Sequence, residues 1–128
     1  MDSTQAQIVA VVDDDEDVRR ALGNLLASLD LAVADFPSAE DFLASPACRA
    51  AACLITDVQM PGMSGLELQR HLIDSGNRLP VIFVTAFPRE HVRQQAEAGG
   101  AIGFFAKPFD GALLIECVER ALAARAVE

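Results

Sequence analysis

Short apolar runs alternate along the whole chain with segments of helical periodicity, and this pattern constrains the fold most strongly. The apolar runs occupy residues 8–12, 31–35, 53–56, 81–84 and 101–105. A continuous apolar run is typical of a strand that is covered on both faces. After the first run, Val18, Leu22, Leu25, Leu26 and Leu29 recur at helical spacing and predict an amphipathic helix. The alternation predicts an α/β fold: a five-stranded parallel sheet, doubly wound, with five helices on its two faces.

Local signals place the ends of the other helices. Ser38 can cap a helix that runs to about residue 44, and Ser64 with Glu67 forms a capping box for the next helix. Pro88 is suited to the first turn of a helix that ends near residues 99–100. Asp110 can cap a last helix, which the final residues continue.

Length and composition limit the class of protein. The 128 residues correspond to one domain, so residues 1–128 are expected to be a single domain without an effector domain. The ten basic and nineteen acidic residues give a net charge of −9, which argues against direct nucleic acid binding and favours divalent cations or basic partners. No run is long enough to span a membrane, and residues 1–7 lack the features of a secretory signal. The three cysteines, Cys48, Cys53 and Cys117, cannot all pair and show no metal-binding spacing, so they are expected to be buried apolar residues in a reducing compartment. The expected location is cytoplasmic.

Polar side chains follow four of the five predicted strands. Asp13 and Asp14 follow the first strand, Asp57 the third, Thr85 the fourth and Lys107 the fifth. In an open parallel sheet, ligands bind beyond the carboxyl ends of the strands, so these groups are expected to meet. Carboxylates this close raise each other's pKa unless a cation joins them, and Mg²⁺ accepts such oxygen ligands.

An acidic turn can also be a solvated surface that caps a helix. This interpretation is preferred for Asp15, Glu16 and Asp17, which precede or begin the first helix. It explains Asp13 and Asp14 less well, because it leaves Asp57 unexplained.

Four motifs, in order along the chain, resemble those of one family. The segment Asp57-x-x-Met-Pro-Gly-x-x-Gly65 is similar to the phosphoacceptor loop of two-component response-regulator receiver domains. The family's other signatures resemble three further segments, residues 12–16, 84–86 and 107–109. The sequence of residues 79–87 is most similar to the FixJ-like subgroup. The resemblance implies a CheY-like, flavodoxin-like (βα)5 fold with strand order 2-1-3-4-5.

The resemblance also implies roles in Mg²⁺-dependent phosphoryl transfer. Asp57 would accept the phosphoryl group from a sensor histidine kinase. Asp14 would bind Mg²⁺ directly and Asp13 through water, together with Asp57 and the main-chain carbonyl of Gln59. The chain would be a phosphoacceptor that assists its own phosphorylation and dephosphorylation, and not an enzyme with an external substrate.

Further implied roles concern charge and switching. Lys107, whose bond to Pro108 is often cis in the family, and Thr85 would contact the phosphoryl oxygens. Thr85 would move toward the phosphoryl group and leave room for Phe104, three residues before the lysine, to turn inward. This would reshape the face formed by the helix after Pro88, the fifth strand and the last helix, with the candidate contact residues Arg89, Val92, Arg93 and Gln95.

That face would support a phosphorylation-dependent homodimer or control an output domain. In the FixJ-like subgroup the receiver is usually followed by a LuxR-type DNA-binding domain in a longer parent protein. Two alternatives stay open: an Asp-nucleophile phosphatase or phosphotransferase, and a non-phosphorylated adaptor that keeps the fold for protein contacts.

Overall fold

The computed structural model describes the backbone of residues 7–127 and the side chains of residues 7–124. Residues 1–6 and 128 lie outside the described residues. The prediction about a secretory signal concerns residues 1–7 and therefore falls mostly outside them. Between residues 7 and 127, no helix has both the length and the apolar character needed to cross a bilayer.

In the described part of the chain, five parallel strands form one sheet in the order β2-β1-β3-β4-β5, as predicted. The strands are β1 (Ile8–Val12), β2 (Ala32–Phe36), β3 (Cys53–Thr56), β4 (Val81–Thr85) and β5 (Gly103–Ala106). The helices are α1 (Glu16–Ala27), α2 (Ala39–Leu43), α3 (Ala47–Ala50), α4 (Gly65–Asp74), α5 (Glu90–Ala98) and α6 (Gly111–Val127).

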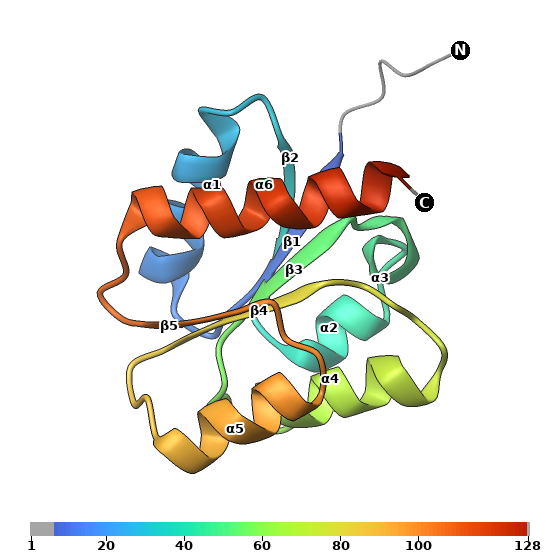
Figure 1. Ribbon diagram of the computed structural model, residues 1–128, viewed down its shortest axis with the longest axis vertical. Coiled ribbons are helices and arrows are strands. Elements are labelled where there is room, and N and C mark those ends of the chain that lie inside the picture. The colour runs from blue at the N-terminus through green and yellow to red at the C-terminus, as the bar shows by residue number, and fades with distance from the viewer. Residues whose placement is uncertain (1–6, 128) are drawn as a thin grey trace.

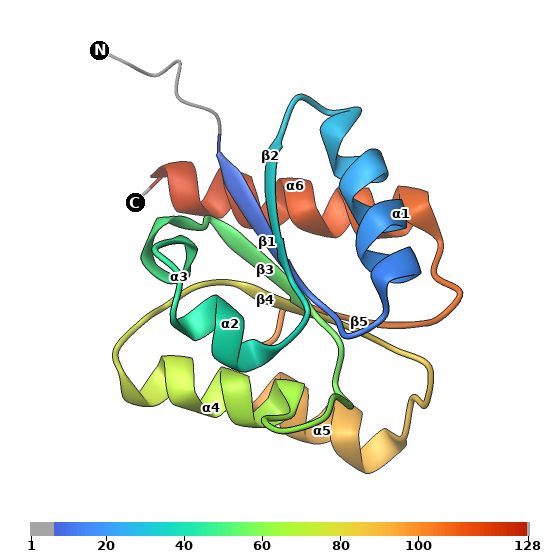
Figure 2. The same cartoon turned by 180° about the vertical axis from the view of Figure 1, so that it is seen from behind.

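Helices cover both faces of the sheet, with α1 and α6 on one side and α2, α4 and α5 on the other (Figures 1 and 2). Successive side chains of a strand point to opposite faces, so each central strand contributes to two cores. In β1, Val9 and Val11 pack with residues of α1 and α6, whereas Ala10 and Val12 pack with residues of α2 and α4. This two-sided burial explains why the strands appear in the sequence as continuous apolar runs.

The predicted helix caps are confirmed. The Ser38 hydroxyl accepts the Asp41 N–H, and Ser64 and Glu67 form the reciprocal capping box of α4. Asp15 caps α1 by accepting the Asp17 N–H, and Asp110 accepts two N–H groups of the first turn of α6. Local chemistry therefore decides where these four helices begin.

Several predicted boundaries were wrong. Residues 7–127 form six helices and not five, because the chain after α2 breaks at Ser45–Pro46 and forms the separate short helix α3. The first helix ends before Leu29, since Asp30 adopts a φ of 62° and reverses the chain. Pro88 precedes α5, which begins at Glu90.

The turn before α5 has an identifiable cause. The Phe87 N–H donates to the Thr85 hydroxyl, which holds residues 85–87 in a turn and delays the helix. Strand β5 likewise begins at Gly103 and not at residue 101, because the Ala101 N–H still closes the end of α5 by donating to the Ala96 carbonyl.

The cysteines were predicted to be buried apolar residues. This is right for Cys53 and Cys117, while Cys48 is only half-buried. Burial raises the pKa of the Cys53 thiol to about 12, so this thiol is protonated at neutral pH.

Candidate functional site

Functional side chains gather at one edge of the sheet because all five strands are parallel. Asp13 directly follows β1, Asp57 directly follows β3, Thr85 ends β4, and Lys107 directly follows β5. In this strand order, the chain continues from β1 to the outer strand β2 and from β3 to β4 on the other side. The two connections diverge, which opens a crevice between the carboxyl ends of β1 and β3. The site therefore lies where the topology predicts it.

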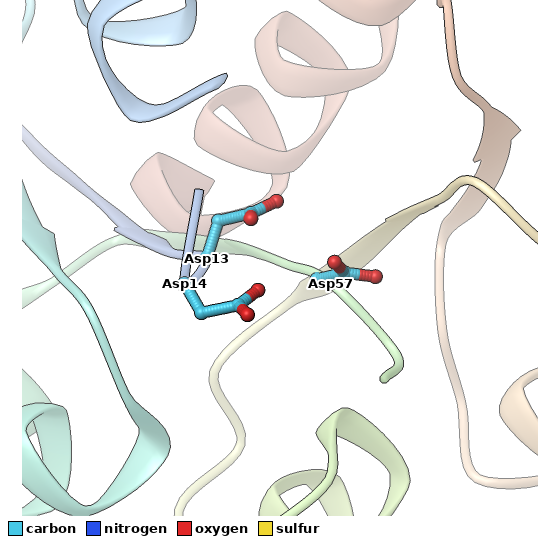
Figure 3. A group of neighbouring side chains, drawn as sticks. All are labelled: Asp13, Asp14 and Asp57. Atoms are coloured by element: carbon cyan, nitrogen blue, oxygen red, sulfur yellow. The ribbon is translucent and has the colours of Figure 1, made fainter. Parts of the chain in front are cut away.

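Three carboxylates project into the crevice from two neighbouring strands. One oxygen each from Asp13, Asp14 and Asp57 lies within 4.8 Å of the other two (Figure 3). Asp13 and Asp57 are buried, with 2% and 8% of their surface exposed, whereas Asp14 is exposed. The predicted group of acidic residues is thus brought together, and its open side faces solvent at Asp14.

Lys107 bridges the two buried carboxylates. Its Nζ lies 2.9 Å from Asp13 Oδ2 and 3.1 Å from Asp57 Oδ2. Burial by itself would lower the pKa of Lys107, but hydrogen bonds and charges from Asp13 and Asp57 outweigh burial and raise it. The peptide bond between Lys107 and Pro108 is cis. Its contacts with Asp13 and Asp57 keep Lys107 a charged ammonium group inside the site.

Ionisation of Asp13 is electrostatically unfavourable in the folded protein. Burial raises the pKa of Asp13 above its ordinary value. Hydrogen bonds from Lys107 and from the Asp15 N–H offset only part of this effect, and the charge of Asp57 opposes ionisation further. The cluster also holds three carboxylates against one ammonium group, which favours an additional cation.

The two oxygens of Asp57 have different surroundings. Oδ1 accepts the N–H groups of Val58 and Gln59, at 2.6 and 3.3 Å, while Oδ2 faces Lys107. The Asp57 main chain is itself fixed, because its N–H donates to the Val12 carbonyl on β1. These contacts hold the carboxylate in one orientation toward the crevice.

A small open cavity of about 260 Å³ surrounds these groups. Its lining consists of Asp13, Asp14, Asp15, Asp57, Gln59, Ala86, Phe87 and Lys107. The donor set fits a hard divalent cation, because carboxylate oxygens predominate and the space admits water molecules. Gln59 lines this cavity, and its role as a carbonyl ligand stays a prediction.

Two predicted residues lie outside the cavity lining. Thr85 is buried, and its hydroxyl accepts the Phe87 N–H. Phe104 is half-buried and packs against Phe83, with ring centroids 6.3 Å apart. The switch was predicted to turn Phe104 inward, yet in this structure the ring already packs against the core.

The residues proposed for the contact face differ in availability. Arg89 and Gln95 are exposed, and Val92 packs against the core. Arg93 forms ion pairs with Glu90 and Glu97 on its own helix. Arg89 and Gln95 are therefore the freer of the four. His71 and His91 are both exposed.

The structure adds one supporting residue that sequence reasoning missed. Arg19 of α1 donates from Nη1 to the Asp13 carbonyl at 2.8 Å, and its Nε pairs with Asp35 of β2 at 3.0 Å. Arg19 thereby ties the turn after β1 to the neighbouring strand. Its position in an amphipathic helix carries no signal of this contact.

The fold and the site define a class: a doubly wound α/β domain whose switch point holds an acidic, lysine-bridged pocket with a donor set that fits a divalent cation. Residues 9–119 match the family model described as the response regulator receiver domain. The chain belongs to this family, which confirms the resemblance seen in its motifs.

Individual relatives agree with this assignment. Response regulator protein TodT of Pseudomonas putida is 39% identical over 120 residues, covering 94% of this chain and 53% of TodT. Transcriptional regulatory protein FixJ of Rhizobium meliloti is 40% identical over 113 residues, covering 88% of this chain and 55% of FixJ. The solved structure of FixJ-N superimposes with a TM-score of 0.82 at 40% identity, covering 94% of this chain and 96% of that one. The chain thus spans about half the length of the curated relatives it matches.

Proposed function

We propose that this chain accepts a phosphoryl group on Asp57 from the phosphohistidine of a sensor histidine kinase, in a Mg²⁺-dependent reaction. The observation that supports this most strongly is the Asp57 carboxylate, oriented by two N–H donors and by Lys107 beside Asp13 and Asp14. As a receiver, the chain acts with a histidine kinase and an output domain. Because it performs one transfer to itself, it is a phosphoacceptor and not an enzyme with an external substrate.

The reaction asks for positioning and charge compensation more than for covalent chemistry. An oxygen of Asp57 attacks the phosphorus, the phosphorus–nitrogen bond to histidine breaks, and an acyl phosphate forms on Asp57. Asp13, Asp14, Asp57 and the Gln59 carbonyl would hold Mg²⁺, which supplies positive charge to offset the phosphoryl oxygens.

Lys107 supplies the second positive charge. In the unphosphorylated state its ammonium group pairs with both Asp13 and Asp57. Formation of the acyl phosphate removes the carboxylate charge of Asp57 and adds phosphoryl oxygens at the same place. Lys107 is then positioned to pair with a phosphoryl oxygen while it keeps its contact with Asp13.

The signal would pass through Thr85. In this structure its hydroxyl accepts the Phe87 N–H. A hydrogen bond donated by this hydroxyl to a phosphoryl oxygen would reorganise the turn that precedes α5. Phe104 packs on β4 next to this turn and would respond to the change. The face formed by α5, β5 and α6 would then favour a homodimer or an altered contact with an output domain.

The relatives support a proposal about the wider setting. TodT and FixJ carry the names of response and transcriptional regulators, and each is about twice as long as the matched region. We propose that this receiver controls a LuxR-type DNA-binding output domain in a longer parent protein, in the cytoplasm.

Acetyl phosphate with Mg²⁺, followed by intact-mass measurement, tests the proposal. The parent should gain one phosphoryl group, Asp57→Asn should gain none, and Asp74→Asn, which changes an exposed acid at the end of α4, should behave like the parent. Repeated turnover of a phosphomonoester would favour the phosphatase. A parent that never gains the phosphoryl mass would favour the adaptor.

A further inference from the structure

Glu40 of helix α2 reaches the loop that follows Asp57. Its Oε2 accepts the N–H of Met63 at 2.9 Å, across a sequence separation of 23 residues. Among the side chains of residues 7–124, Glu40 and Asp57 are the two from outside the loop and α4 that hydrogen-bond the main chain of residues 58–64, and Glu40 is the one distant in sequence. The contact therefore joins the element after β2 to the loop after β3.

The loop is shaped to receive this carboxylate. Gly62 has a φ of +78°, a conformation that favours glycine, and a Cβ at Gly62 would lie only 2.7 Å from Glu40 Oε2. The hydrogen bond from Met63 also holds the pKa of Glu40 below its ordinary value, so the acceptor is charged at neutral pH. Backbone conformation, available space and charge thus agree at one point.

The remainder of the loop is fixed mainly at its two ends. At the start, Val58 and Gln59 donate to Asp57, and at the end the Gly65 N–H donates to the Val58 carbonyl at 2.8 Å. Gln59, which lines the acidic cavity, is exposed, and its N–H contact with Asp57 is the longer of the two at 3.3 Å. The hydrogen bond from Met63 to Glu40 adds a restraint in the second half of the loop, beyond those at its two ends.

We propose that Glu40 is a positioning residue for the acceptor site: by holding Met63 it restrains the loop and keeps the Gln59 main chain where a cation beside Asp57 can use it. This inference rests on the proposed function. Glu40 does not line the cavity, so it acts through the loop and touches neither the cation nor the phosphoryl group.

Three variants separate this role from a general effect of charge. Glu40→Ala removes the acceptor, whereas Glu40→Gln keeps an amide oxygen that can accept the Met63 N–H. Asp41→Ala removes an equal charge from the same turn of α2, at an exposed side chain without a hydrogen bond in the described part of the chain. If Glu40 acts through its hydrogen bond, Glu40→Gln and Asp41→Ala should both resemble the parent.

The first measurement is the rate of phosphorylation by acetyl phosphate as a function of Mg²⁺ concentration, followed by intact mass. Glu40→Ala should raise the half-saturating Mg²⁺ concentration about fivefold, the effect expected for one lost hydrogen bond, with little change in the rate at saturating Mg²⁺. Equal Mg²⁺ dependence in parent and Glu40→Ala, or equal impairment in Glu40→Gln, would overturn the proposal.

The second measurement, amide hydrogen exchange at Met63 without Mg²⁺ or phosphate, reads the contact itself. Met63 should be protected in the parent and in Glu40→Gln, and should exchange about fivefold faster in Glu40→Ala. Unchanged exchange would overturn the inference even if the parent is phosphorylated normally. A parent with a protected Met63 that takes up no phosphoryl group would instead refute the proposed function, and the positioning role with it.

Discussion

Replacing Gly65 with alanine tests how tightly the loop after Asp57 is packed. Gly65 begins α4, and its N–H donates to the Val58 carbonyl at 2.8 Å. A Cβ at this position would lie 2.1 Å from the Asp57 carbonyl oxygen, where ordinary contact begins at 3.4 Å. The atoms it meets belong to the backbone, so no flexible side chain can move aside.

The expected cost follows from these contacts. Forcing extra volume into a packed site costs about 1–3 kcal/mol. Displacing the Asp57 carbonyl also weakens the hydrogen bond that it accepts from the Thr56 hydroxyl at 2.9 Å, worth about 1 kcal/mol. The greater helix propensity of alanine returns at most about 1 kcal/mol. The free energy of unfolding should therefore fall by about 1–3 kcal/mol, which lowers Tm by about 4–11 °C in a domain of this size.

Gly23→Ala is the matched control. Gly23 lies inside α1, and a Cβ there would meet nothing within 4 Å, so this variant should gain about 0.5–1 kcal/mol from helix propensity. Urea and thermal unfolding followed by circular dichroism suit a chain without Trp or Tyr. If Gly65→Ala lies within about 0.5 kcal/mol of the parent while Gly23→Ala is stabilised, the packing argument is wrong.

Three further predictions concern charge, core and thiols. Burial raises the pKa of Asp13 above 3.8 in the folded state. The ionised carboxylate therefore lowers the free energy of unfolding at a pH above this raised pKa, and the loss disappears as the pH falls through the raised pKa. In EDTA at pH 7, Asp13→Asn should unfold at a higher urea concentration than the parent, and a gain that does not shrink toward pH 3.8 would contradict this. Leu114→Ala, which empties a fully buried position, should cost about 2–5 kcal/mol in urea unfolding, whereas Leu113→Ala, 52% exposed, should cost under about 1 kcal/mol; similar losses would refute the assignment of the core. In the native protein a thiol reagent at pH 8 should label Cys48 and spare Cys53, whose pKa is about 12, and the reverse order would contradict the burial described.

Local signals in the sequence were sufficient for the strands and for most helix ends. Each strand is an apolar run because both faces of the sheet are covered, and each cap acts within three residues of itself. The separate helix α3 and the late start of α5 escaped prediction. In the second case a side chain, Thr85, holds the turn and overrides the preference of Pro88 for a first helical turn.

The sequence also predicted that Asp13, Asp14, Asp57 and Lys107 meet, because parallel strands place the residues at their carboxyl ends along one edge. Thr85 and Phe104, also predicted for the site, lie outside the cavity lining. The individual contacts did not follow from the sequence. Lys107 meets Asp57 across 50 residues and Asp13 across 94, and Glu40 meets Met63 across 23. The periodicity of the sequence cannot predict such pairs, because they form only when the sheet and its loops bring distant segments to within 3.1 Å of each other. The sequence by itself determined which groups stand at the edge of the sheet, and only the tertiary structure decided which of them touch.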